Sequence, residues 1–107
     1  MSVRERLDGV SIDTKANVYF EGRCVSHTIR LADGSRKSVG VILPAKKLTF
    51  ETAAPEKMEL VAGRCRVVLP GANTAQEFTA GQSFDVPAKS SFEIEALEPL
   101  HYVCHFG

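Results

Sequence analysis

The sequence has little of several features that identify particular classes of protein. It contains no tryptophan and only three cysteines, Cys24, Cys65 and Cys104, with no C-x-x-C pair. Three cysteines cannot all pair as in the disulfide framework of a small secreted domain, so we expect free thiols in a reducing compartment. The cysteines are also not clustered with histidines as in a structural zinc site. We therefore expect no metal site built on cysteine.

Charge of one sign and long apolar runs are also missing. The 13 Lys and Arg residues balance the 13 Asp and Glu residues, whereas domains that bind nucleic acid usually carry a basic excess. The longest apolar run, Val39 to Leu43, is far too short to span a bilayer. Residues 1–15 lack the apolar segment of a secretory signal. We expect a cytoplasmic protein without nucleic-acid or membrane partners.

The chain length of 107 residues predicts one domain. Residues 1–16 show no sustained apolar period and are interpreted as a loosely ordered N-terminal extension. Residues 17–107 form the predicted domain.

From residue 17 onward, apolar and polar residues alternate in short runs that are separated by turn residues. Asp33-Gly34 is a strong hairpin signal, because these residues tolerate the positive φ that such turns need. No segment has a convincing helical period. About ten short strands at this spacing predict an all-β sandwich or barrel. The clearest expected strands are 23–31, 38–43, 48–52, 56–62, 65–69, 83–86, 91–97 and 100–106.

Two spacings narrow the choice of all-β fold. Glu56 is followed after six residues by Gly63, in EKMELVAG, and Gly81 is followed after five by Pro87, in GQSFDVP. In this order, the two segments resemble the second half of the first cupin motif and the first half of the second. The resemblance implies a single cupin barrel, which is a small jelly roll with an internal ligand pocket.

The histidines of metal-binding cupins are missing from the corresponding positions. These positions fall on Phe50, Thr52 and Phe92. None of these side chains supplies the imidazole nitrogen that such a metal site uses. The resemblance therefore implies a cupin without a metal.

A closer resemblance covers residues 17–107, almost without gaps. The sequence is similar to the small single-domain cupins of the pyrimidine/purine nucleoside phosphorylase family. The similarity implies phosphorolysis with broad base tolerance, in which a nucleoside and inorganic phosphate give a free base and ribose 1-phosphate, with no other cofactor. The matching segments are NVYF at 17–20, SVGV at 38–41, LTF at 48–50, PEKM at 55–58, VLP at 68–70, FDVP at 84–87, SF at 91–92 and YVC at 102–104.

Phosphorolysis at C1′ of ribose passes through a transition state with positive charge on the sugar. A carboxylate near the sugar would stabilise that charge. Glu56 is the predicted catalytic residue, because it shares strand parity with Met58 and Leu60 and should point inward. The alternative is that Glu56, directly after Pro55, lies on a solvated rim.

The remaining candidates would bind the substrates. For the nucleoside they are Tyr19, Ser38, Phe50, Met58, Phe92 and Tyr102, although aromatic side chains at such positions also simply fill a core. For phosphate they are Arg23 and Arg36, with Lys46 and Lys89 behind them, because arginine matches phosphate with two parallel hydrogen bonds. Ordinary solvated charges are the alternative for these four.

Two other functions stay open at this point. One is a non-catalytic cupin that binds a small sugar or nucleotide as a sensor, and the other is a structural dimer module with a closed core. In each case we expect a homodimer, because an apolar strand at Val18 to Phe20 would pair across a two-fold axis and cover a sheet edge.

Overall fold

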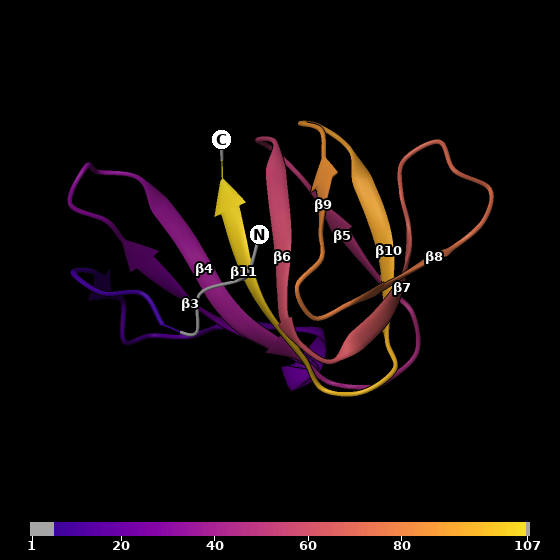
Figure 1. Ribbon diagram of the computed structural model, residues 1–107, viewed down its shortest axis with the longest axis horizontal. Coiled ribbons are helices and arrows are strands. Elements are labelled where there is room, and N and C mark those ends of the chain that lie inside the picture. Colours follow the sequence, from indigo (N-terminus) through magenta and orange to yellow (C-terminus); the bar gives the residue numbers. More distant parts are fainter. Residues whose placement is uncertain (1–5, 107) are drawn as a thin grey trace.

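The computed structural model describes residues 6–106 and is almost entirely β-structure (Figure 1). The all-β prediction is confirmed. Between β2 and β3 lies a single 3₁₀ turn, η1, at Phe20–Gly22. The eleven strands of the described residues are β1 (Ser11–Ile12), β2 (Asn17–Tyr19), β3 (Cys24–Arg30), β4 (Arg36–Ile42), β5 (Leu48–Glu51), β6 (Glu56–Ala62), β7 (Arg64–Val68), β8 (Gln76–Thr79), β9 (Ser83–Val86), β10 (Ser91–Ala96) and β11 (Leu100–Phe106).

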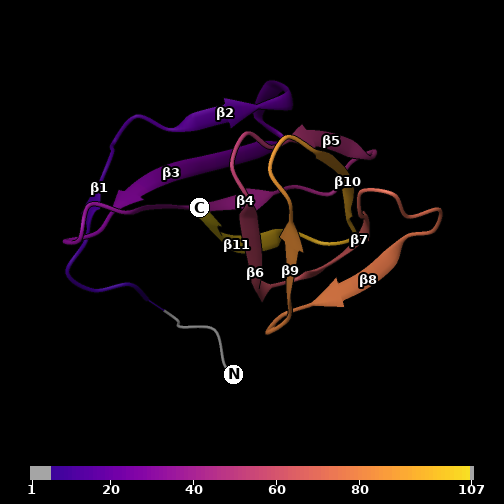
Figure 2. The ribbon, with the colours of Figure 1, turned by 90° about the horizontal axis from the view of Figure 1, so that it is seen from above.

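The strands form two antiparallel sheets. The larger has the order β1-β3-β4-β11-β6-β9, with β2 also paired to β3, and the smaller has the order β5-β10-β7-β8. Figures 1 and 2 show the smaller sheet beside one end of the larger. Consecutive strands often belong to different sheets, so the chain crosses between the sheets several times. Neither strand order closes on itself within the described residues, so the hydrogen bonding gives two open sheets rather than one closed barrel.

Alternation along the strands determines which side chains fill the core. Leu60, Val67, Ile94 and Leu100 are completely buried, while Glu93 between two buried neighbours on β10 is exposed. Side chains at every second position point to the same face of a strand, so one face of each sheet packs against the other sheet. This part of the structure follows directly from the sequence pattern.

Three predicted strands have the expected bounds, namely 56–62, 83–86 and 100–106. The predicted hairpin turn is also present, with Gly34 at φ +88° between β3 and β4. Strand β8 was not predicted. Its residues are mostly exposed, so the sequence there lacks an apolar alternation, although Phe78 packs against the core.

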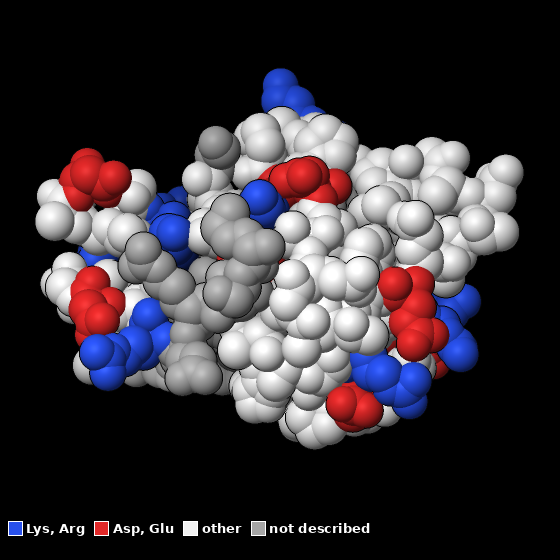
Figure 3. Space-filling view, viewed as in Figure 1, with Lys and Arg blue, Asp and Glu red and all other residues white. Residues whose placement is uncertain are grey.

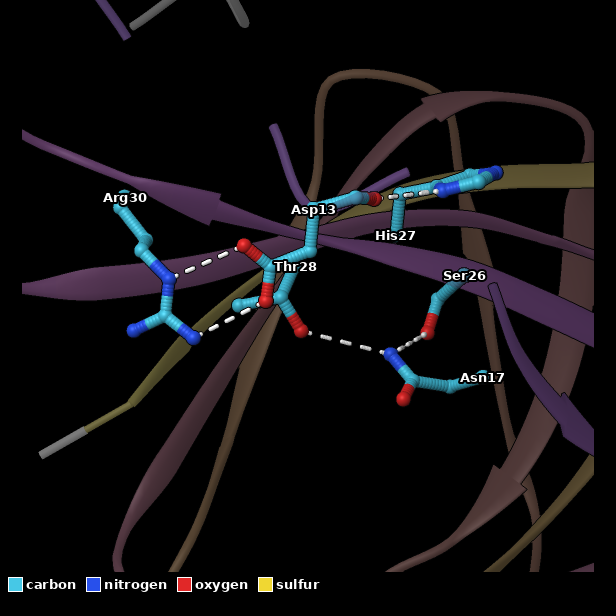
Figure 4. A network of polar contacts seen from close by, with 6 residues as sticks. All are labelled: Asp13, Asn17, Ser26, His27, Thr28 and Arg30. Carbon is cyan, nitrogen blue, oxygen red and sulfur yellow. Dashed lines mark hydrogen bonds and ion pairs between the residues drawn. The ribbon is translucent and has the colours of Figure 1, made fainter. Parts of the chain in front are cut away.

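Part of the N-terminal extension makes defined contacts with β3, as Figure 4 shows. Residues Ser11 and Ile12 pair with it as β1. Asp13 accepts two hydrogen bonds from the Arg30 guanidinium, which holds the pKa of Asp13 below its usual value. The Asp13 carbonyl lies 3.0 Å from Nδ1 of His27. Residues 11–13 are therefore attached to the large sheet, whereas residues 1–5 of the expected extension lie outside the described residues.

Acidic and basic side chains are mixed on the surface. Figure 3 shows Lys and Arg next to Asp and Glu on one face, rather than gathered by sign. Within residues 6–106, no helix is long and apolar enough to cross a membrane.

Candidate functional site

A small cavity lies over the inner face of the large sheet, where β6, β11, β4 and β3 run side by side. It has a volume of about 130 Å³. Residues from β2, β5 and β10 complete its walls. Its lining residues are Tyr19, Ser26, Ser38, Ile42, Phe50, Glu51, Glu56, Met58, Phe92, Tyr102, Cys104 and Phe106.

The structure brings the predicted catalytic and nucleoside-binding residues together in this cavity. Its lining includes Glu56 and all six predicted nucleoside-binding residues, Tyr19, Ser38, Phe50, Met58, Phe92 and Tyr102. These residues come from six different strands. Strand parity pointed to Glu56, Met58 and Tyr102, whereas Phe50 and Phe92 were selected because they occupy the positions of the missing cupin histidines.

The predicted phosphate-binding residues are arranged differently. Arg23, Lys46 and Lys89 are exposed and are not among the residues that line the cavity. Arg36 lies near its margin, since its guanidinium carbon is 5.3 Å from the centroid of the Phe106 ring. Within residues 6–106, the cavity wall itself contains the carboxylates Glu51 and Glu56 and no Lys or Arg.

Glu56 is half-buried at the start of β6. The thiol of Cys104 on β11 donates a hydrogen bond to Oε1 of Glu56 over 3.5 Å. Burial raises the pKa of the Glu56 carboxyl, and the hydrogen bond from Cys104 partly opposes this effect. Glu56 is thus a partly desolvated carboxyl group that lines the cavity on one side and borders a more open hollow of the surface on the other.

Tyr102 forms the polar part of the cavity floor. Its hydroxyl lies 3.4 Å from Sγ of Cys24. Burial, more than the contact with Cys24, raises the pKa of Tyr102, so the phenol stays protonated. Gly40 makes room for it, because a Cβ at Gly40 would lie 2.8 Å from the Tyr102 hydroxyl and 2.6 Å from the Val25 carbonyl oxygen. The absent side chain at position 40 thus determines where the hydroxyl lies.

Aromatic rings form the opposite wall. Phe50 stacks on Phe92, with ring centroids 5.7 Å apart and an interplanar angle of 19°. Tyr19 and Phe20 approach Phe50 edge-on, at centroid distances of 6.2 and 5.2 Å. Phe20 and Glu21 both have positive φ, an uncommon conformation for residues other than glycine. Tyr19 at the end of β2 and Phe20 at the start of η1 therefore place two partly exposed aromatic rings against Phe50 of the cavity wall.

The residues at the positions that correspond to the histidines of metal-binding cupins are not metal ligands. Phe50 and Phe92 occupy two of them as stacked rings, and Thr52 occupies the third. The Thr52 hydroxyl donates to the Pro87 carbonyl oxygen over 2.6 Å. Among residues 6–106, no group of three or more His, Cys, Asp or Glu side chains is placed to hold a metal ion. The residues present do not fit the metal that other cupins bind.

Sequence reasoning missed five of the lining residues. Cys104 and Phe106 share strand parity with Tyr102, so the alternation of β11 could have identified them. Ser26 lies on the face of β3 opposite to the more apolar residues that dominated the pattern. Glu51 and Ile42 stand at strand ends, where parity is a weaker guide.

The size of the cavity limits what it encloses in this conformation. Pockets that bury most of a drug-sized ligand measure about 300–1,000 Å³, compared with about 130 Å³ here. A ligand of that size would therefore place only part of its surface inside the cavity.

Comparison with solved structures identifies the fold class. An RmlC-like cupin from Shewanella frigidimarina superposes with a TM-score of 0.68, over 88% of this chain and 83% of that one, at 14% identity. A protein of unknown function from Acinetobacter sp. ADP1 superposes with a TM-score of 0.94 at 50% identity, over 95% of this chain and 98% of that one. This chain therefore has a cupin-like fold.

The family follows from sequence comparison. The model of the pyrimidine/purine nucleoside phosphorylase family matches residues 14–106. A protein from Thiobacillus denitrificans with the name pyrimidine/purine nucleoside phosphorylase is 65% identical, over 95% of this chain and 98% of that protein. The chain belongs to this family, as its sequence resemblance implied.

Proposed function

We propose that the protein catalyses phosphorolysis of purine and pyrimidine nucleosides, giving a free base and ribose 1-phosphate without a metal. Membership in the nucleoside phosphorylase family supports the reaction class. In the cavity, the observation that carries the proposal is the position of Glu56, a partly buried carboxyl group opposite a wall of stacked aromatic rings. We also propose that the two sheets together correspond to the jelly-roll barrel of cupins.

In this proposal, the base lies against the aromatic wall and the sugar faces Glu56. As the glycosidic bond lengthens, positive charge develops on the sugar, and an ionised Glu56 stabilises it. Electrostatic stabilisation of this kind is stronger at a half-buried carboxylate than at a fully solvated one, because the surrounding dielectric constant is lower. The wide contact surface of Phe50 and Phe92 is compatible with different bases, because stacking does not depend on base-edge hydrogen bonds.

Phosphate would attack from the margin of the cavity where Arg36 lies over Phe106. Arginine is suited to binding a phosphate with two parallel hydrogen bonds. Arg36 is an exposed residue at the start of β4, so its side chain is free to turn toward a phosphate. Arg36 is therefore the preferred phosphate-binding residue of the two arginines.

A second candidate function is supported by the electrostatics of the same cavity. Two carboxylates and no Lys or Arg line it within the described residues, which favours a neutral sugar or nucleoside over an anion. A non-catalytic cupin that senses such a ligand would need no phosphate site.

One assay separates the two functions. The purified protein is incubated with a panel of purine and pyrimidine nucleosides, with and without inorganic phosphate, and free base is measured by chromatography. Phosphate-dependent base release together with ribose 1-phosphate supports phosphorolysis. Nucleoside binding by calorimetry without base release supports the sensor, and release without phosphate contradicts both proposals.

We further propose that the protein works in the cytoplasm, where inorganic phosphate and nucleosides are available as co-substrates, and that it is a homodimer. The unpaired side of β2 and its exposed Val18 support the second proposal.

A further inference from the structure

Three polar side chains form a row across the cavity floor, on three neighbouring strands. Ser38 on β4 stands directly across from Cys104 on β11 in the strand register, and Glu56 on β6 is paired with Phe106, two residues further along β11. The Cys104 thiol donates to Oε1 of Glu56 over 3.5 Å. The side chain of Ser38 is buried, with a relative exposure of 7%, and it lines the same cavity.

The chemistry of the row determines the direction of its hydrogen bonds. Burial and the neighbouring Glu56 raise the pKa of the Cys104 thiol, so the sulfur keeps its proton and donates to the carboxylate. Ser38 is the residue across from Cys104 in the strand register, and its hydroxyl lowers the pKa of the thiol, against the larger effect of burial. In residues 6–106, Oε2 of Glu56 has no hydrogen bond of its own. One carboxyl oxygen is thus held by the protein and the other is available to a ligand.

We propose that Cys104 is a positioning residue for Glu56, and that its thiol holds one carboxyl oxygen so that the other faces the substrate. The role of Cys104 in catalysis rests on the proposed function, whereas its effect on Glu56 does not. By donating to the carboxylate, the thiol also opposes the effect of burial and helps Glu56 to be ionised when positive charge develops on the sugar.

Other charged and titratable groups near Glu56 do not replace this contact. Glu51 on β5 and the tyrosines Tyr19 and Tyr102 line the same cavity. A second, more open hollow that Glu56 also borders is lined by Lys57, Glu59, Asp85 and His105, with His105 paired to Glu59. Within residues 6–106, Cys104 is the hydrogen-bond donor of Glu56.

The experiment compares Cys104→Ser with Cys104→Ala, which are similar in size and therefore change the volume of the cavity equally. Serine keeps a donor and alanine does not, so the difference between them reports the hydrogen bond. The carboxyl carbon of Glu56 is titrated by NMR, with Glu56→Gln to assign its signal. We expect a lower pKa of Glu56 in Cys104→Ser than in Cys104→Ala. Cys65→Ala, which removes a buried thiol on β7 outside the cavity, should leave the titration of Glu56 unchanged.

Kinetics then test the consequence for catalysis. We expect kcat to fall about two- to tenfold in Cys104→Ala, the range for losing one hydrogen bond, and to be largely restored in Cys104→Ser. The acid limb of the kcat/KM profile should lie at higher pH in Cys104→Ala than in Cys104→Ser. Equal Glu56 titrations in the two variants would overturn the proposal even in an active enzyme. A shifted titration in a protein that releases no base would instead reject only the proposed function and, with it, the catalytic role.

Discussion

Phe50 and Phe92 stack 5.7 Å apart at positions where metal-binding cupins carry histidine ligands. The two rings belong to directly paired residues of β5 and β10. Because the pair is also in contact with Phe84 at 5.6 Å, it belongs both to the core and to the wall of the cavity. The pair therefore presents a stacking surface to the cavity.

The first prediction concerns metal dependence. We expect phosphorolysis to survive exhaustive treatment with EDTA, since phenylalanine and threonine cannot provide the nitrogen ligands of a cupin metal. Activity is measured before chelation, after chelation and after addition of single divalent metals. Loss of activity in EDTA that one specific metal restores would show that a metal binds elsewhere in the protein.

The second prediction concerns Glu56. Glu56→Gln preserves the shape of the side chain and removes its charge, which matters most when positive charge develops at C1′. We expect kcat and kcat/KM to fall together, by about 10²–10³-fold, the typical effect of removing one electrostatic contact of a transition state. Glu93→Gln is the matched control, because Glu93 is exposed on β10 and lies outside the cavity. Wild-type rates in both variants would remove Glu56 from the mechanism.

The third prediction is a pH dependence of stability. Burial raises the pKa of Glu56, so the folded protein binds this proton more tightly than the unfolded chain does. The ionised carboxylate therefore opposes folding at pH values above the raised pKa. We expect Glu56→Gln to have a higher free energy of unfolding than the wild type at pH 7. This difference should disappear as the pH falls below the pKa that the Glu56 carboxyl has in the unfolded chain. Denaturant unfolding across this range measures the difference, and a constant difference would contradict the assignment.

The fourth prediction concerns Gly40. A methyl group at this position would lie too close to the Val25 carbonyl oxygen and the Tyr102 hydroxyl. We expect Gly40→Ala to lower the free energy of unfolding by about 1–3 kcal/mol, as for other overpacked sites. Adding Tyr102→Phe should recover part of this loss, because it removes one of the three close contacts, the others being the Val25 carbonyl oxygen and the Ser26 Cβ, and the double-mutant cycle measures the coupling. Strict additivity of the two changes would show that the hydroxyl does not use the space at position 40.

The fifth prediction concerns assembly. β2 pairs with β3 on one side only within the described residues, and its Val18 is 61% exposed. We expect light scattering to give the mass of a homodimer at micromolar concentration, and Val18→Lys to shift it toward the monomer, since a charge at a sheet edge opposes pairing. Val61→Lys tests in the same way whether the apolar surface on the outer face of β6 contributes to the dimer. A monomeric wild type would reject the homodimer.

The sequence predicted most of the fold because alternation was clear wherever a strand has one buried face. The predicted bounds of β6 and the inward direction of Met58 and Leu60 depend on this pattern. β8 escaped prediction, because a mostly exposed strand carries little apolar signal. β1 was also missed, because its two residues pair with residues 29 and 30 of β3, a distant pairing that no local pattern contains.

For the candidate site, strand parity pointed to Glu56 and Tyr102, and the resemblance to cupin motifs pointed to Phe50 and Phe92; all four residues line one cavity. Parity describes only the two faces of a strand, and it does not place long side chains at the margins. Arg23 was selected for its charge alone and is not among the lining residues, while Arg36 reaches the margin through its contact with Phe106. The pairing of Cys104 with Glu56 depends on the register between β11 and β6, which no local pattern contains.

All three cysteines are buried within the folded domain, and burial raises the pKa of each thiol, to about 11 for Cys65. Thiolate is the reactive form, so alkylating reagents should modify the native protein slowly. Each modification would then report an opening event of the strand that carries the cysteine, β3, β7 or β11. The natural sequence thus provides three internal probes of local unfolding, two in the large sheet and one in the small sheet, which mass spectrometry can follow without any introduced label.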